Sequence, residues 1–368
     1  HEPVLLMVYA DAKGSAGVQM AGFVPKRSVP SGLVPVPGRD RTYHWNERIG
    51  FADLPGRELG RRSRWLVAAD GDPTYGAGAK EIEFLWRGGA RSARIKSLLA
   101  EHVRSGPVSV RTLVSVQGDV FSEGSRDFIE TALVLAGDPE SLGTEASTVA
   151  KLLRDWDGRA SSPSVGAAVY HVFLDLLLRA VFEPEMGEDL LRRYLALVRA
   201  NPTQLLHQTL VAVKEGRDET EGWSDPGEVR EAVRRSLRDT WIRMSVELGV
   251  NREKWTWGRL HTLRFAPLWR EGWAGQDDDF GPFPDEGDGS SVRIAEYRPL
   301  ESFDTRVVSG YRFIVDTADL DQALTSLAPG QSEHPGHPHS TDRLVHWRQD
   351  RPALLSTNQL VLEGSSHA

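Results

Sequence analysis

The 368-residue chain contains no cysteine and no long uninterrupted hydrophobic segment. Without cysteine, the chain has no disulfide bonds, no thiolate zinc sites and no cysteine nucleophile. A membrane-spanning helix needs a run of about 18 apolar residues. The longest apolar stretch, residues 167–182, is interrupted by His171, Asp175 and Arg179. We therefore expect no membrane span.

The chain also lacks an excess of positive charge. It has 44 lysine and arginine residues against 52 aspartate and glutamate residues, which gives a formal net charge of −8. Binding to nucleic-acid phosphates requires a basic surface. General nucleic-acid binding is therefore not expected.

Several familiar sequence signals are absent as well. The chain starts with His1-Glu2-Pro3 and has no signal peptide, so we expect that it is trimmed, cleaved or separated from an earlier segment. No G-x-S-x-G, H-E-x-x-H, Walker or helix-opening G-x-G-x-x-G sequence occurs. A Ser–His–Asp triad is not excluded by spacing, but nothing points to one.

Hydrophobic periodicity divides the chain into three parts: a β-rich part (residues 1–80), a mostly helical part (81–288) and a second β-rich part (289–368). The expected strands are 5–11, 16–24, 64–69, 291–297, 309–316 and 352–360. The expected helices are 91–102, 144–155, 164–182 and 226–249. Strands at both ends indicate an α+β fold in which a large helical block is inserted into a sheet-centred core.

The helix expected at 226–249 has the clearest pattern. Pro226 follows Ser224 or Asp225 as the capping residue, and Gly249 ends the helix. Apolar residues recur at spacings of three and four and should face a core, so Trp241→Ala should cost roughly 3–5 kcal/mol. The stripe consists of Val229, Val233, Leu237, Trp241, Met244 and Leu248.

Residues 276–288 form an acidic cluster whose carboxylates could in principle hold calcium. Their spacing is not that of an EF-hand, and charge runs usually face water. We therefore interpret the cluster as a solvated loop. Its members are Asp277, Asp278, Asp279, Asp285, Glu286 and Asp288.

Two further clusters have both a functional and a structural interpretation. His334, His337 and His339 are close enough to bind zinc or copper, but stiff prolines separate them and no distant ligand is evident, so we expect no metal site.

The segment Trp255-Thr256-Trp257-Gly258, followed by His261 and Phe265, could stack on a ligand. Packing under a core is the more common use of such aromatics, and we favour it.

Taken together, several short motifs resemble, in their order and spacing, most of a β chain of the penicillin acylase family of N-terminal-nucleophile hydrolases. These motifs are Tyr9-Ala10-Asp11 with Gly14, Ala21-Gly22-Phe23-Val24-Pro25-Lys26-Arg27, Pro35-Val36-Pro37-Gly38, Trp45, Leu54-Pro55, Arg91, Arg94-Ile95, Trp156-Asp157-Gly158, Trp255 to Phe265, Ser309-Gly310-Tyr311-Arg312 and Pro329-Gly330-Gln331-Ser332.

This resemblance implies a four-layer αββα sandwich and a precursor that cuts itself into α and β chains. It also implies hydrolysis of a small-molecule acyl amide through an acyl-enzyme, with the first serine of the β chain as nucleophile. No Ser, Thr or Cys stands first here, so no nucleophile is expected in this chain. Either a second chain or an N-terminal segment supplies it, or this protein has lost it.

The same resemblance places two site residues. The oxyanion asparagine of the family falls on Asp70, and a conserved family arginine near the site falls on Arg91. An ionised aspartate cannot donate to an oxyanion, so Asp70 is either a protonated donor, a base or amine partner held ionised by Arg91, or only a turn residue before Gly71. The family's calcium ligand falls near Lys80 or Glu81, so calcium and other cofactors are not expected.

Three functions remain open on the sequence. The first is amide hydrolysis, the second is a re-purposed acyl transferase or cyclase, and the third is an inactive ligand-binding homologue. Asp70 at the asparagine position favours the last two. The stretch His337-Pro338-His339-Ser340-Thr341-Asp342-Arg343 also departs from the family pattern. The resemblance implies a secreted or periplasmic protein, whereas a biosynthetic role would imply the cytoplasm.

Overall fold

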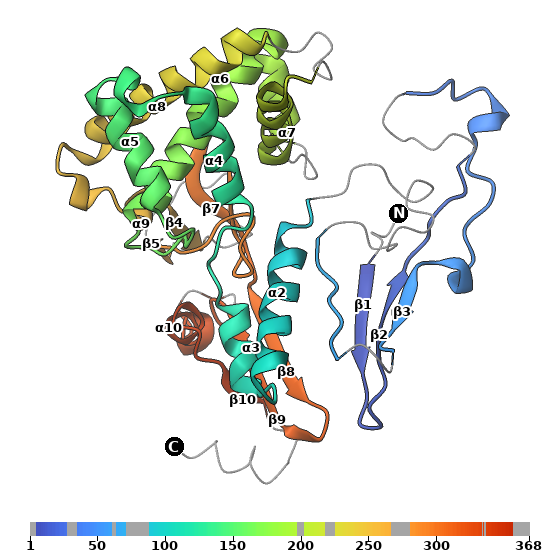
Figure 1. Cartoon of the computed structure of the whole chain (residues 1–368). Coiled ribbons are helices and arrows are strands. Elements are labelled where there is room, and N and C mark those ends of the chain that lie inside the picture. Colours follow the sequence, from blue (N-terminus) through green and yellow to red (C-terminus); the bar gives the residue numbers. More distant parts are fainter. Residues whose placement is uncertain are drawn as a thin grey trace. The chain divides into compact units, whose positions relative to one another are not determined.

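The computed structural model describes residues 5–27, 35–60, 64–70, 88–196, 202–217, 225–265, 280–332, 334 and 336–355. The chain forms two compact units (Figure 1). Unit 1 comprises residues 1–113, 313–325 and 354–368, and unit 2 comprises residues 114–312 and 326–353.

Unit 1 begins with a three-stranded antiparallel sheet, which we call the N-terminal sheet. Its strands are β1 (Leu5–Ala10), β2 (Ala16–Ala21) and β3 (Gly56–Glu58), in the order β1-β2-β3. The turn between β1 and β2 is held by Asp11, whose carboxylate accepts hydrogen bonds from the backbone of Lys13 and Ser15. Gly14 has a φ of 87°, which few other residues adopt. The expected hairpin is confirmed.

The N-terminal sheet has a small core of its own. Met20, Val24 and Leu54 form its buried cluster. By contrast, large hydrophobic side chains along β1 are exposed, among them Val8 at 63%. Unit 1 also contains α2 (Ala90–Ser105) and the first half of α3 (Val110–Gln117).

The helices of unit 2 pack around one large hydrophobic core (Figure 1). Helix α6 packs against α5, α7 and α8, and α4 packs against α5, α7 and α8. These helices are α4 (Ser125–Ala136), α5 (Thr144–Asp155), α6 (Val165–Leu195), α7 (Pro202–Glu215) and α8 (Pro226–Leu248).

Helix α6 is the central helix of this core. The Ser164 hydroxyl caps it by accepting a hydrogen bond from the backbone of Ala167. It runs further than the expected 164–182, passing Pro184 and bending at Gly187, which has a φ of 70°. By length and composition it is the one helix in the described part of the chain that could cross a membrane, yet 72% of its most apolar window is buried within the protein.

Helix α8 confirms the expected helix almost residue for residue. Asp225 caps it by accepting from the backbone of Gly227 and Glu228. The predicted apolar stripe is buried, except that Trp241 is only partly buried and packs edge-on against Trp255. The inward orientation expected for Trp241 is confirmed, because its partly buried ring packs against the core.

Short strands follow the helices. The pairs β4–β5 and β6–β7 are antiparallel, and β10, β9 and β8 form a three-stranded sheet in that order. These elements are α9 (Trp257–Leu260), β4 (Thr262–Phe265), β5 (Phe280–Pro284), β6 (Ala295–Arg298), β7 (Ser302–Val308), β8 (Tyr311–Asp316), β9 (Asp319–Leu327), α10 (Leu344–Arg348) and β10 (Ala353–Leu355).

All four expected helices are present, but helices α3, α4 and α7 and strands β3, β7 and β9 were not expected as elements. Three of the expected ranges also differ from the structure. Residues 64–69 form no strand, because no described strand offers them ladder hydrogen bonds. Strands β4 and β5 lie inside the part expected to be mostly helical. The described part of the expected strand 352–360 contains β10. Residues 356–360 lie outside the described residues.

Candidate functional site

The two site residues placed by resemblance form an ion pair in unit 1. Arg91 Nε lies 2.5 Å from Asp70 Oδ2, and Arg91 Nη2 lies 3.1 Å from Asp70 Oδ1. Both side chains are partly buried, with 21% and 16% exposure. Asp70 ends the irregular segment 64–70, and Arg91 lies in the first turn of α2. A segment 21 positions away is thereby tied to the start of a helix.

The Asp70 carboxylate compensates the positive charge of Arg91 at the start of α2. A positive side chain at a helix N-terminus is unfavourable by itself, because the helix dipole is also positive there. The Asp70 carboxylate offsets both charges, and the two parallel hydrogen bonds fix the guanidinium plane. Asp70 accepts both bonds as a carboxylate and so donates none. Gly71, Lys80 and Glu81 lie outside the described residues.

The histidine cluster near the C-terminus is exposed and serves local structure. His337 Nδ1 accepts from the backbone of His339, and His339 Nδ1 lies 2.9 Å from Asp342 Oδ2. In the portion of the chain that the structure describes, no group of three or more His, Cys, Asp or Glu residues is arranged to hold a metal. That the cluster binds no metal stays a prediction from the sequence.

Part of the acidic cluster is buried, contrary to the expectation of a solvated loop. Asp285 and Asp288 are each 3% exposed. The expectation was wrong for these two residues because each finds buried polar partners: Arg293 Nη1 lies 3.0 Å from Asp285, and His171 faces Asp288. The neighbouring residues 277–279 lie outside the described residues.

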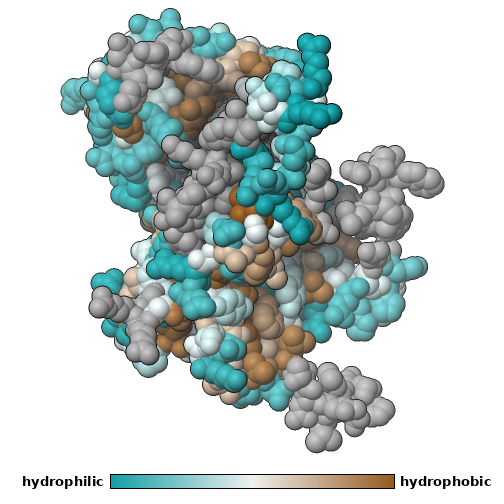
Figure 2. Space-filling view, turned by 90° about the vertical axis from the view of Figure 1, so that its right-hand side faces the viewer, coloured by the Kyte–Doolittle hydropathy of each residue, from teal (hydrophilic) through white to brown (hydrophobic). Residues whose placement is uncertain are grey.

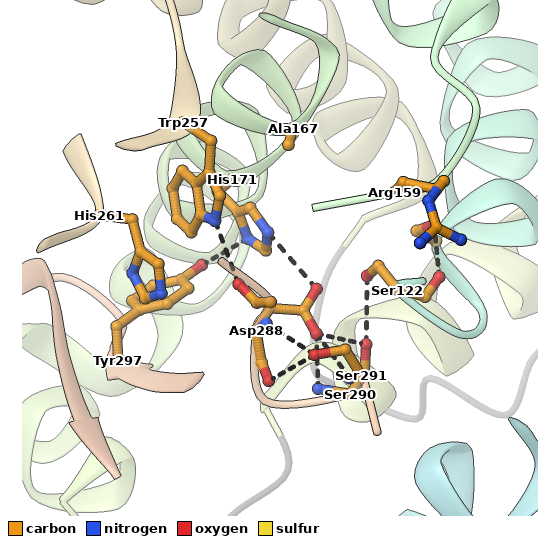
Figure 3. Close-up of polar contacts among 12 residues, drawn as sticks. Ser122, Arg159, Ala167, His171, Trp257, His261, Asp288, Ser290, Ser291 and Tyr297 are labelled. Atoms are coloured by element: carbon orange, nitrogen blue, oxygen red, sulfur yellow. Dashed lines mark hydrogen bonds and ion pairs between the residues drawn. The ribbon is translucent and has the colours of Figure 1, made fainter. Parts of the chain in front are cut away.

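The aromatic segment expected to pack under a core does so, in a buried polar cluster of unit 2 (Figure 3). Trp257 is fully buried and is flanked by two stacked imidazoles, His171 at 4.2 Å and His261 at 4.4 Å between ring centroids. The indole Nε1 donates to the carbonyl of Gly287. Tyr297 Oη lies 3.0 Å from His171 Nδ1, and burial raises the pKa of Tyr297.

Asp288 connects this cluster to a turn (Figure 3). Its Oδ1 accepts from the backbone and hydroxyl of Ser290 and from the backbone of Ser291, and its Oδ2 faces His171 Nε2 at 3.4 Å. Ser290 Oγ lies 3.1 Å from Ser122 Oγ. Burial acts to raise the pKa of Asp288, but the facing His171 ring and the backbone hydrogen bond from Ser290 hold it well below its ordinary range.

A second carboxylate reaches His261 through a hydroxyl. Thr305 Oγ1 lies 2.9 Å from Asp285 Oδ2 and 3.1 Å from His261 Nε2. His261 Nδ1 lies 2.6 Å from the carbonyl of Phe303. Burial lowers the pKa of His261 from 6.5 to about 4, and Asp285 opposes that shift only in part.

Sequence reasoning missed the buried polar cluster. In the sequence, His171 and Asp175 interrupt an otherwise apolar helix. Such polar residues in an apolar stretch are the pattern that could have indicated a buried polar cluster. Asp175 is also buried, where it accepts from Arg243 Nη1 at 2.7 Å and from the backbone of Leu300 at 2.6 Å. Leu300 has a φ of 64°, so this bond stabilises an unusual backbone conformation.

Comparison with known proteins gives consistent results. A family model described as penicillin amidase matches residues 1–360. The chain is 28% identical to an acyl-homoserine lactone acylase, QuiP, of Pseudomonas syringae pv. syringae over 96% of its own length and 44% of that protein. It is 25% identical to a penicillin acylase 2 proenzyme of Pseudomonas sp. strain SE83, over 97% of its own length and 45% of that protein.

The fold is shared with a solved enzyme. A thermostable penicillin G acylase from Alcaligenes faecalis aligns with a TM-score of 0.66 and 16% identity, over 98% of this chain and 66% of that one. This confirms the expected fold class, an α+β N-terminal-nucleophile hydrolase fold. The chain spans less than half the length of the curated relatives it matches. From the match across 360 residues, we conclude that the chain belongs to the penicillin amidase family.

Proposed function

We propose that this protein hydrolyses the amide bond of N-acyl small molecules through an acyl-enzyme, with the nucleophile supplied by polypeptide outside the present chain. The observation that carries the proposal is the family match over residues 1–360, together with relatives named as acylases of acyl-homoserine lactones and of penicillin. An adjacent base activates the nucleophile, and fixed donors stabilise the oxyanion.

The Asp70–Arg91 pair supports a specific role at this site. In the proposed site, Arg91 donates two hydrogen bonds to the Asp70 carboxylate and so fixes its direction. An ionised Asp70 serves as a base or as the partner of a substrate amine, rather than as an oxyanion donor. This departure from the family's asparagine favours a second candidate function, a re-purposed acyl transferase or cyclase.

Substitution of Asp70 distinguishes these functions. We would measure turnover of an N-acyl-homoserine lactone and of a penicillin by the assembled protein carrying Asp70→Asn or Asp70→Ala. Asp189→Asn is the matched control, because it removes a surface Asp–Arg pair in which Arg193 lies 2.9 Å away and both side chains are at least 75% exposed. The control should leave turnover unchanged.

Each outcome identifies one function. If the protein is an ordinary hydrolase, Asp70→Asn provides a neutral donor and should raise kcat by about 10²–10³-fold. In a re-purposed enzyme, both substitutions should abolish the native reaction. Product analysis of the unsubstituted protein should then show transfer of the acyl group to an amine instead of to water. Binding of an acyl amide without turnover by any form indicates an inactive homologue. Unchanged activity in both variants would show that Asp70 is a turn residue.

We further propose that a second segment or chain covers the N-terminal sheet. Exposed apolar side chains along β1, such as Leu5, Met7 and Val8, favour association with another polypeptide. Residues 1–368 expressed alone should be insoluble, or molten in the N-terminal sheet while the helical core of unit 2 keeps its structure. A monomeric product that melts cooperatively would contradict this proposal.

No cofactor is part of the proposed chemistry. The serine, its amine and fixed hydrogen-bond donors suffice for acyl transfer. Treatment of the assembled protein with EDTA should therefore leave turnover and melting temperature unchanged. Loss of either on chelation, with recovery on adding calcium, would contradict this.

A further inference from the structure

The two edge strands of the N-terminal sheet differ in length and in charge (Figure 1). Strand β3 is three residues long and carries Arg57 and Glu58, and short, charged strands protect a sheet edge against pairing with another chain. Strand β1 is six residues long, contains neither a charged residue nor a proline, and pairs with β2 in unbroken register. Among the residues that the structure describes, no strand pairs with its outer edge. The edge of β1 is therefore open and unprotected.

The sequence of β1 is that of an interior strand. A strand with one buried face alternates apolar and polar residues, whereas a strand buried on both faces is apolar throughout. The sequence Leu-Leu-Met-Val-Tyr-Ala of β1 belongs to the second kind. Successive side chains point to opposite faces, and Met7 on one face is 52% exposed while Val8 on the other is 63% exposed. Strand β1 thus has an interior composition at an edge position.

The backbone of β1 bonds to β2 through every second residue. Asp11 N, directly after β1, donates to the carbonyl of Ser15. In an antiparallel ladder, hydrogen-bonded and non-hydrogen-bonded pairs alternate. Counting back from Asp11 in steps of two, Tyr9 and Met7 are the residues whose N–H and C=O groups face β2.

The remaining residues of β1 direct their backbone groups toward the open edge. Leu6 lies opposite Met20, and Met20 N points away from β1, since it donates to the carbonyl of Pro55 beside β3. Leu6 and Met20 therefore form a non-hydrogen-bonded pair, as the alternation requires. It follows that the N–H and C=O groups of Leu6, Val8 and Ala10 point away from β2, where another strand can bond to them.

We propose that a β-strand of the polypeptide that completes the protein pairs with the open edge of β1, so that β1 becomes an interior strand of a wider sheet. This inference rests on the proposed function, which places the nucleophile on polypeptide outside the present chain. The added strand exchanges backbone hydrogen bonds with Leu6, Val8 and Ala10, and such main-chain pairing supplies affinity. Relatives contain enough additional polypeptide, because the chain matches only 44% and 45% of their length.

A second copy of the chain is the competing occupant of this edge. Two β1 edges can pair with each other, but an edge-to-edge pair only widens the sheet. It leaves the apolar side chains on both faces of β1, such as Met7 and Val8, in contact with water. A completing polypeptide supplies both the paired strand and the layers that cover the two faces, so we favour it.

Residue-resolved hydrogen exchange in the assembled protein tests the pairing. The amides of Met7 and Tyr9 bond to β2 and provide the reference within the same strand. Those of Leu6, Val8 and Ala10 should be protected equally, by on the order of a thousandfold relative to intrinsic rates. A layer that covers the sheet without edge pairing protects Met7 and Tyr9 alone, and that result would overturn the proposal. Protection that disappears on dilution, together with a dimer in ultracentrifugation, would assign the edge to a second copy and also overturn it.

A proline substitution tests the same edge by a second route. Val8→Pro removes an outward amide and leaves the bonds of Met7 and Tyr9 to β2 in place, whereas the control Val8→Thr keeps the amide and the shape of the side chain. In the assembled protein, Val8→Pro should accelerate exchange at Leu6 and Ala10 by about tenfold or more relative to Val8→Thr. Equal exchange in the two variants would contradict the pairing.

These outcomes are separate from those that test hydrolysis. An assembled protein that hydrolyses an N-acyl amide while Leu6, Val8 and Ala10 exchange rapidly would refute the pairing and retain the proposed function. Protection of these amides in a protein without turnover would retain the pairing and contradict the proposed function.

Discussion

The helical core of unit 2 and the N-terminal sheet of unit 1 bury very different amounts of apolar surface. The first contains fully buried phenylalanine and leucine side chains from five helices, together with Trp255 and Trp257, which follow α8 in the sequence. The second has Met20, Val24 and Leu54. The sheet also exposes large hydrophobic side chains on β1. Figure 2 shows hydrophobic surface, in brown, on one face of the molecule. Burial of apolar area is the main stabilising contribution to folding. The helical core should therefore be stable without a partner, and the sheet should depend on one.

Matched tryptophan truncations in the two regions should give the largest contrast. Trp255 is fully buried, and its Nε1 donates to the Gly249 carbonyl at 2.6 Å. Trp255→Ala should lower the free energy of unfolding by about 3–5 kcal/mol. Trp45 in unit 1 is 55% exposed and lies beside Arg27, so Trp45→Ala should cost below about 1 kcal/mol. Denaturant titration of both variants checks this, and equal losses would remove the contrast.

Acid should destabilise the helical core through His261. The pKa of His261 is about 4 in the folded protein because of burial, against 6.5 ordinarily, so the unfolded chain takes up the proton first as the pH falls. The free energy of unfolding should fall by up to about 3 kcal/mol between pH 6.5 and pH 4. Melting curves across this range measure the effect. A curve for His261→Gln with the same pH slope would refute the assignment.

Helix caps should have smaller effects that stay within the helical core. Asp225→Ala removes the acceptor for two backbone amides at the start of α8 and should cost about 1 kcal/mol. Asp239→Ala on the same helix, half-buried and 3.9 Å from Arg238, is the control and should cost below about 0.5 kcal/mol. Chemical denaturation of both variants tests the difference, and a neutral Asp225→Ala would place the start of α8 elsewhere.

Four helices, α2, α5, α6 and α8, were predicted because their signals are local, whereas α3, α4 and α7 were not predicted as elements. Asp225, Pro226 and the apolar stripe of α8 define its start and its buried face from sequence alone. The residues 64–69 show the limit of such signals, since a strand also needs a partner that local sequence does not specify. The apolar run of α6 likewise predicted a buried helix but not its extension beyond Pro184.

The site was less predictable for a related reason. Asp70 and Arg91 were placed by resemblance, and the structure adds that they pair. Asp285 and Asp288 were expected in solvent because charge runs usually are. Their burial depends on Arg293 and His171, and His171 lies more than a hundred positions away in the sequence. Long-range polar partners of this kind cannot be identified from spacing.

Hydrogen exchange followed by mass spectrometry on residues 1–368 alone tests the central comparison most directly. The amides of α6 and α8 should exchange slowly, because they belong to a core that needs no partner, while those of β1 and β2 should exchange rapidly. Adding the segment that completes the protein should slow exchange in β1 and β2 alone. Equal protection of β1, β2 and α6 in the chain by itself would contradict the account.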